Sequence, residues 1–138
     1  YDSTYTWIGQ KDIQHHNTDI SFSPDIISSG SINFIPVRSG EISLISKYVS
    51  RQYLDNTSEV ATSLDPYFVQ TIRMAYTLKN TFCKQATIIL QVNNLFSTKY
   101  NSNGYNNYKD IESGEVVAYN NYFPMALINY MLGVNISF

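Results

Sequence analysis

An alternation of apolar and other side chains runs through the last fifteen residues of the chain, 124–138. Counted back from the carboxyl end, every second residue is apolar: Phe138, Ile136, Val134, Leu132, Tyr130, Ile128 and Ala126. The positions between them are small or polar toward that end, apart from Met131. A period of two places alternate side chains on opposite faces of a strand. The pattern therefore predicts a long strand with one apolar and one polar face, which is typical of strands that cross a bilayer within a barrel.

A similar alternation predicts four earlier strands, at about residues 26–37, 41–53, 67–79 and 86–99. Apolar exceptions fall on the predicted polar faces at Ile45, Val49, Val69, Ile89 and Leu95, and polar exceptions on the apolar faces at Ser46, Ser50, Gln70 and Asn94. Residues 1–25 are predicted to form a loop or the end of a preceding strand, and residues 100–123 a long loop rich in Asn, Tyr and Gly. The expected fold is all-β, an antiparallel up-and-down meander of about five long strands within residues 26–138, with no second domain.

The lengths of the connections carry topological information. They alternate between short and long, at about residues 38–40, 54–66, 80–85 and 100–123. In an up-and-down meander the short turns collect at one end and the long loops at the other, as in outer-membrane barrels. The smallest bacterial barrels have about eight strands, so about five strands cannot close one. Because bare sheet edges invite pairing with further strands, we expect this sheet to be part of a larger transmembrane barrel.

Composition fits this expectation and excludes several classes of protein. Charged residues make up 14% of the 138 residues, below the roughly 25% of soluble domains, and Tyr, Asn, Ser and Thr fill the gap. The net charge of −2 and the lack of a basic run argue against nucleic-acid binding. No apolar run approaches the ~20 residues of a membrane helix, and the single cysteine, Cys83, excludes an internal disulfide. The first residue is Tyr1 rather than Met, which suggests a piece of a larger protein, with a mature processed protein as the alternative.

Several short stretches carry a resemblance to a known family. They are Ser46-Lys47-Tyr48-Val49, Leu64-Asp65-Pro66-Tyr67-Phe68-Val69, Val92-Asn93-Asn94-Leu95-Phe96 followed by Lys99-Tyr100 and Asn103-Gly104-Tyr105, and Tyr122-Phe123-Pro124 followed by Gly133-Val134 and the terminal Phe138. In combination they make the chain resemble the carboxyl-terminal end of TonB-dependent outer-membrane receptors, particularly those of the Bacteroidetes type. The resemblance covers nearly everything after residue 20.

The resemblance implies a barrel of about 22 strands in the bacterial outer membrane, with its lumen filled by an amino-terminal plug. Such receptors take up iron chelates, haem, cobalamin or oligosaccharides, powered by contact with TonB. This sequence contains neither a plug nor a TonB-contacting segment. The expected partners are therefore the remaining barrel strands and plug of the same receptor and the outer-membrane lipid, with TonB reached only through the missing part. Transport by this chain alone is not expected.

Polar residues on the predicted strands are candidates for the barrel lumen. Lys47, Arg51 and Arg73 fall on polar faces, as do Gln91 and Asn93. A cation facing lipid at the midplane would cost about 2–4 kcal/mol, so we expect these five side chains to face the lumen. The three cations would contact the plug or an anionic substrate, or would form salt bridges within the barrel wall.

Aromatic residues suggest two further sets of candidates. Five fall near predicted strand ends: Phe68, Tyr76, Phe96, Tyr122 and Phe138. Aromatic side chains at these positions are expected to form a girdle at the membrane interfaces. The alternative is the ordinary enrichment of aromatic residues in strands. In the predicted external loop 101–121, six Asn accompany Tyr105, Tyr108 and Tyr119. Amphipathic rings with adaptable amides could stack on sugars, and the alternative is a solvated loop.

Catalytic and metal-binding chemistry is not expected. His15 and His16 lack metal-ligand spacing, and Asp55, Glu59 and Asp65 are expected in a solvated loop. No Ser-His-Asp or Cys-His grouping occurs at usable spacing, so we expect neither an enzyme nor a cofactor. The main alternative is a soluble all-β carbohydrate-binding module, a sandwich whose apolar faces pack on one another. That alternative predicts a monomer that needs no detergent.

Overall fold

The computed structural model describes residues 14–79, 84–110 and 116–138; residues 1–13 of the predicted amino-terminal loop and Cys83 lie outside them. The described residues form an all-β fold without an α-helix. Its strands are β1 (Ile27–Val37), β2 (Gly40–Val49), β3 (Gln52–Tyr53), β4 (Ser63–Leu64), β5 (Tyr67–Lys79), β6 (Gln85–Asn93), β7 (Asn101–Asp110), β8 (Val116–Pro124) and β9 (Asn129–Ser137), with one 3₁₀ turn, η1 (Val60–Thr62).

The main sheet has five strands in the order β1-β2-β5-β6-β9, and every neighbouring pair is antiparallel. This confirms the predicted meander. Two strands end earlier than predicted. The β2–β5 ladder ends at the pair Val49 and Tyr67, because Pro66 has no amide hydrogen to continue it. β6 ends at Asn93, because Asn94 has a left-handed backbone with φ of 49°.

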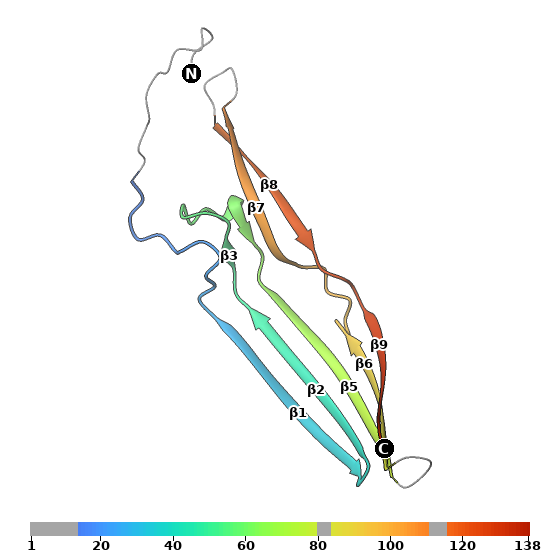
Figure 1. Ribbon diagram of the computed structural model, residues 1–138. Helices are drawn as coiled ribbons and strands as arrows, with labels where there is room; N and C mark the ends of the chain where they lie inside the picture. Colours follow the sequence, from blue (N-terminus) through green and yellow to red (C-terminus); the bar gives the residue numbers. More distant parts are fainter. Residues whose placement is uncertain (1–13, 80–83, 111–115) are drawn as a thin grey trace.

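Short and long connections lie at opposite ends of the sheet (Figure 1). At one end, Arg38 and Ser39 join β1 to β2. Gly40 is needed there, since a Cβ atom on it would lie 2.9 Å from Cγ2 of Val37. At the other end, the connection from β2 to β5 holds β3, η1 and β4, and the connection from β6 to β9 holds β7 and β8.

The connection from β6 to β9 corrects one prediction. Residues 100–123 are not an irregular loop, because β7 and β8 pair as an antiparallel hairpin, with Tyr105 opposite Asn121 and Asn107 opposite Tyr119. Asn and Gly are depleted in strands, so composition indicated a loop. Packing of the hairpin on residues 54–63 outweighs that local preference.

Apart from Ala86 near the other end of β6, the few buried apolar side chains gather where the main sheet meets the hairpin. Val49 is 3% exposed, Leu54 5% and Leu64 1%. Gly104 of β7 lets the hairpin approach this cluster, since a Cβ atom on it would lie 3.4 Å from Cδ2 of Leu54 and 2.7 Å from the carbonyl oxygen of Asn121. The small core therefore fixes the hairpin to the end of the sheet.

Candidate functional site

The register of the main sheet sorts its side chains into two faces, because residues directly opposite each other on paired strands share a face. One row crosses all five strands through Phe34, Ile42, Met74, Leu90 and Leu132. The face that contains this row, which we call the apolar face, also carries Ile32, Leu44, Tyr48, Phe68, Ile72, Tyr76, Leu78, Ile88, Val92, Tyr130, Val134 and Ile136. The smaller or polar exceptions on it are Ser28, Gly30, Gly40, Ser46, Gln70 and Ala86.

The opposite face, the polar face, has a different chemistry. A typical row runs through Asn33, Ser43, Arg73, Gln91 and Met131. All the charged residues within the five strands lie on this face: Glu41, Lys47, Arg73 and Lys79. The sheet is therefore divided by charge, with no ionisable carboxylate, ammonium or guanidinium group on its apolar side.

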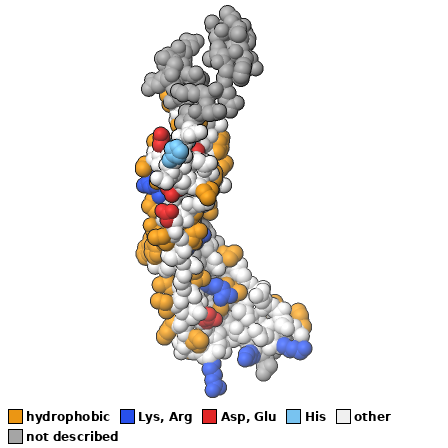
Figure 2. Space-filling model, turned by 90° about the vertical axis from the view of Figure 1, so that its left-hand side faces the viewer, with side chains coloured by type: hydrophobic (Ala, Val, Ile, Leu, Met, Phe, Trp, Pro, Cys, Tyr) orange, Lys and Arg blue, Asp and Glu red, His pale blue; other side chains and the backbone are white. Residues whose placement is uncertain are grey.

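No described segment covers the apolar face. Leu90, near the middle of the sheet, is 37% exposed, and Leu132 at the β9 edge is 71% exposed. Figure 2, which looks at the molecule from the side of β1, shows hydrophobic side chains along its outline and most of the visible Lys and Arg in the half with the short turns. Soluble monomers rarely expose contiguous apolar patches larger than a few hundred Å². The self-packed core required by a soluble sandwich is thus absent from the described residues.

Four of the five predicted lumen-facing residues share the polar face. Lys47, Arg73, Gln91 and Asn93 lie on it, with Lys47 exposed and the other three half-buried. Arg51 instead lies beyond the end of β2, where its Nη1 is 3.2 Å from Oδ1 of Asp65. Arg51 therefore supports the connection between β2 and β5 rather than the sheet wall.

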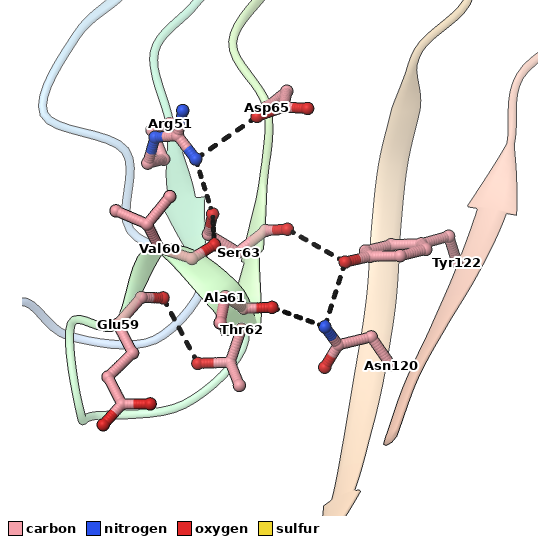
Figure 3. A network of polar contacts seen from close by, with 9 residues as sticks. All are labelled: Arg51, Glu59, Val60, Ala61, Thr62, Ser63, Asp65, Asn120 and Tyr122. Atoms are coloured by element: carbon pink, nitrogen blue, oxygen red, sulfur yellow. Dashed lines mark hydrogen bonds and ion pairs between the residues drawn. The ribbon is translucent and has the colours of Figure 1, made fainter. Parts of the chain in front are cut away.

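Figure 3 shows polar contacts between this connection and the hairpin. Arg51 donates to Oγ of Ser63 at 2.7 Å. Nδ2 of Asn120 donates to the carbonyl oxygen of Ala61 at 2.6 Å, and the hydroxyl of Tyr122 donates to the backbone carbonyl oxygen of Ser63 at 3.4 Å. Tyr122, predicted for a membrane girdle, is 41% exposed and turns its hydroxyl toward this junction.

Asp55 forms a second group of contacts at the junction. Its carboxylate accepts hydrogen bonds from Nδ2 of Asn106, the hydroxyl of Tyr108, and the backbone N–H and hydroxyl of Thr57. Burial alone would raise the pKa of Asp55, but the bonds from Thr57, Tyr108 and Asn106 outweigh it and lower the pKa from 3.8 to about 2. Asp55 is therefore a charged anchor for the hairpin.

The three tyrosines predicted as a ligand loop are not equivalent. Tyr108 is on the hairpin face that contacts Asp55. Tyr105 and Tyr119 lie on the opposite, outer face and are 48% and 49% exposed. Phe123 joins them there, with its ring centroid 6.0 Å from that of Tyr105. Tyr108 is 51% exposed as well, so the three differ in the hydroxyl of Tyr108, which is bonded to Asp55, and not in the exposure of their rings.

The remaining girdle candidates are all exposed. Phe68 and Tyr76 share the apolar face of β5, eight residues and roughly 27 Å apart along the strand. Phe96 follows β6 and is 67% exposed, and Phe138 is 82% exposed. These positions are compatible with rings at two depths of a membrane.

Sequence reasoning missed the role of Asn94, which it treated as a polar exception on an apolar face. Asn94 is 5% exposed. Its Nδ2 donates to the carbonyl oxygens of Thr98 at 2.8 Å and Ala126 at 3.1 Å, and its Oδ1 accepts from the N–H of Thr98 at 2.9 Å. Asn94 thus ties the end of β6 to the segment that enters β9. One property of the sequence could have indicated this role, because Asn tolerates the left-handed backbone conformation better than most other non-glycine residues.

Within the described ranges, no three His, Cys, Asp or Glu side chains gather to hold a metal ion, and His15 and His16 are exposed. Among the same residues, no helix is long and apolar enough to cross a membrane. Comparisons with protein-family models, with curated proteins and with solved structures gave no match.

Proposed function

We propose that this chain is the carboxyl-terminal wall segment of a TonB-dependent outer-membrane transporter for a large nutrient, which is an iron chelate, haem, cobalamin or an oligosaccharide. The proposal rests on the uncovered apolar face of the main sheet, whose opposite face holds all the charged residues of the five strands. Lipid on one side and a hydrated lumen on the other would satisfy both faces. The segment would not transport without the rest of the receptor.

The dimensions of the strands support this proposal. A strand tilted by about 45° needs roughly 9–11 residues to cross the hydrocarbon core. β6 and β9 have 9 residues each, β2 has 10, β1 has 11 and β5 has 13. Each strand of the main sheet is therefore long enough to span a bilayer.

The edges of the sheet indicate what the neighbours would be. In the described part of the chain, β1 pairs only with β2, and β9 only with β6. Unpaired backbone N–H and C=O groups cost several kcal/mol each in hydrocarbon. Further strands of the same receptor would pair with both edges. The hairpin would then stand outside the cell and the short turns in the periplasm.

The soluble carbohydrate-binding module remains a second candidate because of the exposed rings of Tyr105, Tyr119 and Phe123. It would leave the apolar face in water. The cost of exposing apolar area, about 25 cal/mol per Å², weighs against it.

Light scattering on residues 1–138 tests the proposal. Purified without detergent, the chain should aggregate, and in detergent micelles it should become monodisperse with bound detergent. A monodisperse monomer of 15.8 kDa in detergent-free buffer would contradict the membrane assignment. A variant with Leu90, Leu132 and Ile136 replaced by Ser should need less detergent, and one with Asn33, Gln91 and Asn135 replaced by Ser should behave as the parent chain does.

A further inference from the structure

A hollow of about 320 Å³ lies on the polar face near the hairpin end of the sheet. It borders three strands of the main sheet, through Thr71 of β5, Asn93 of β6 and Asn129 of β9. Tyr100 and Met125 border it as well, and the N–H of Met125 donates to the carbonyl oxygen of Tyr100 at 3.0 Å. We call it the amide hollow. Its volume is at the lower end of the range for small-molecule sites, which suits one ring rather than a long ligand.

Amide groups at the hollow are held in place by one another. Nε2 of Gln91 donates to Oδ1 of Asn93 at 2.7 Å, and Nδ2 of Asn93 donates to Oδ1 of Asn129 at 2.9 Å. Nδ2 of Asn129 donates in turn to the carbonyl oxygen of Leu127 at 2.9 Å. Each amide nitrogen has two N–H donors and each oxygen two lone pairs. The chain of bonds therefore orients the amides and leaves each with further donor and acceptor capacity.

An aromatic wall stands beside these amides. The ring of Tyr100 lies 4.3 Å from that of Tyr67, at an interplanar angle of 30°. Because Tyr67 is only 9% exposed, its ring is a fixed neighbour against which the Tyr100 ring packs. A fixed ring beside oriented amides offers an apolar plane next to groups that both donate and accept hydrogen bonds.

Charge narrows the class of ligand. Uncharged side chains line the hollow. The nearest cations in the sheet do not line it: Lys47 is opposite the lining residue Val69 on β2, and Arg73 lies two residues along β5 from Thr71. A ligand that matches this lining is uncharged, about one ring in size, and carries hydroxyl groups around apolar C–H surfaces.

We propose that the amide hollow binds one ring of a neutral saccharide, with the amides on its hydroxyls and Tyr100 against its C–H face. A saccharide site narrows the proposed function, because it names an oligosaccharide as the nutrient. It rests on the proposed function for access of the ligand from the barrel lumen. The binding step itself requires only the folded chain.

The test measures binding of the methyl glycosides of glucose, galactose and mannose to residues 1–138 in detergent, by saturation-transfer NMR. Thr71→Phe fills the hollow from β5, where Phe is well tolerated in a strand. Thr77→Phe makes the same change six residues along the same strand and face, outside the hollow. Far-UV circular dichroism checks that both variants fold.

We expect at least one glycoside to bind in the millimolar range, with affinity about tenfold weaker in Thr71→Phe and within about twofold of the parent chain in Thr77→Phe. Raising sodium chloride from about 0.1 to about 0.5 M should leave the affinity unchanged, since no charge is used. Absence of binding to all three glycosides, equal loss in both variants, or loss with salt would overturn the inference. A detergent-free monomer that still binds selectively would refute the membrane proposal and leave the saccharide site standing.

Discussion

Replacement of Asn94 by Ala should be the most damaging single substitution of a polar residue in the sheet. The change removes three hydrogen bonds that join β6 to the segments containing Thr98 and Ala126. Each such bond contributes about 1 kcal/mol net, and the left-handed backbone costs Ala about 1 kcal/mol. We therefore expect the free energy of unfolding to fall by about 3–4 kcal/mol.

Urea unfolding of the full chain in detergent micelles, followed by far-UV circular dichroism, measures this loss. Asn93→Ala is the matched control, because its half-buried amide makes two bonds, both to other amides, so by the same count its cost should not exceed about 2 kcal/mol. Asn94→Gly keeps the backbone conformation and should lie between the two. The reasoning is refuted if Asn94→Ala unfolds within about 0.5 kcal/mol of the parent chain, or if Asn93→Ala costs as much.

Further predictions concern the two faces and the hairpin. Leu90→Lys on the apolar face should cost about 2–4 kcal/mol and reduce incorporation into lipid vesicles, whereas the adjacent Gln91→Lys on the polar face should incorporate normally; flotation of the vesicles measures both. Because the pKa of Asp55 is lowered from 3.8 to about 2 in the folded chain, its stabilisation is complete above about pH 4 and lost as the pH falls toward 2. Discounted for partial exposure, the free energy of unfolding should fall by about 1 kcal/mol over this pH range. Urea titrations at about pH 5 and pH 2.5 measure this difference, and Asp55→Asn should abolish it. Gly104→Val should release the hairpin from Leu54 and increase proteolysis between β7 and β8, while the same change at Gly30, where a Cβ atom meets nothing within 4 Å, should not.

The alternation of side chains predicted the two faces, and together with the lengths of the connections it predicted the strand order. Ile45, Val69 and Ile89 break the alternation, yet they lie on the polar face as predicted, because pairing register depends on the whole strand. The ends of the strands were less accurate. Pro66 ends the pairing of β2 with β5, and the left-handed Asn94 ends β6. Both effects are local, but only the structure shows that pairing stops at these two residues.

Long-range contacts could not be predicted from the pattern. Tyr108 and Asp55 are 53 residues apart in the sequence, and Asn120 and Ala61 are 59 apart. No periodicity relates such positions, so the hairpin was expected to be a loop and Tyr108 was grouped with the outward-facing Tyr105 and Tyr119. The amide hollow likewise depends on register, which brings Asn93 opposite Asn129.

The central claim is that one face of this sheet meets hydrocarbon, and tryptophan quenching tests it most directly. In a Trp7→Phe background, single tryptophans replace Leu132 on the apolar face or Met131 on the polar face, and each chain is reconstituted into vesicles of lipid brominated at mid-chain. The account predicts strong quenching of the tryptophan at 132 and weak quenching at 131. Equal quenching at both positions, or stronger quenching at 131, would contradict it.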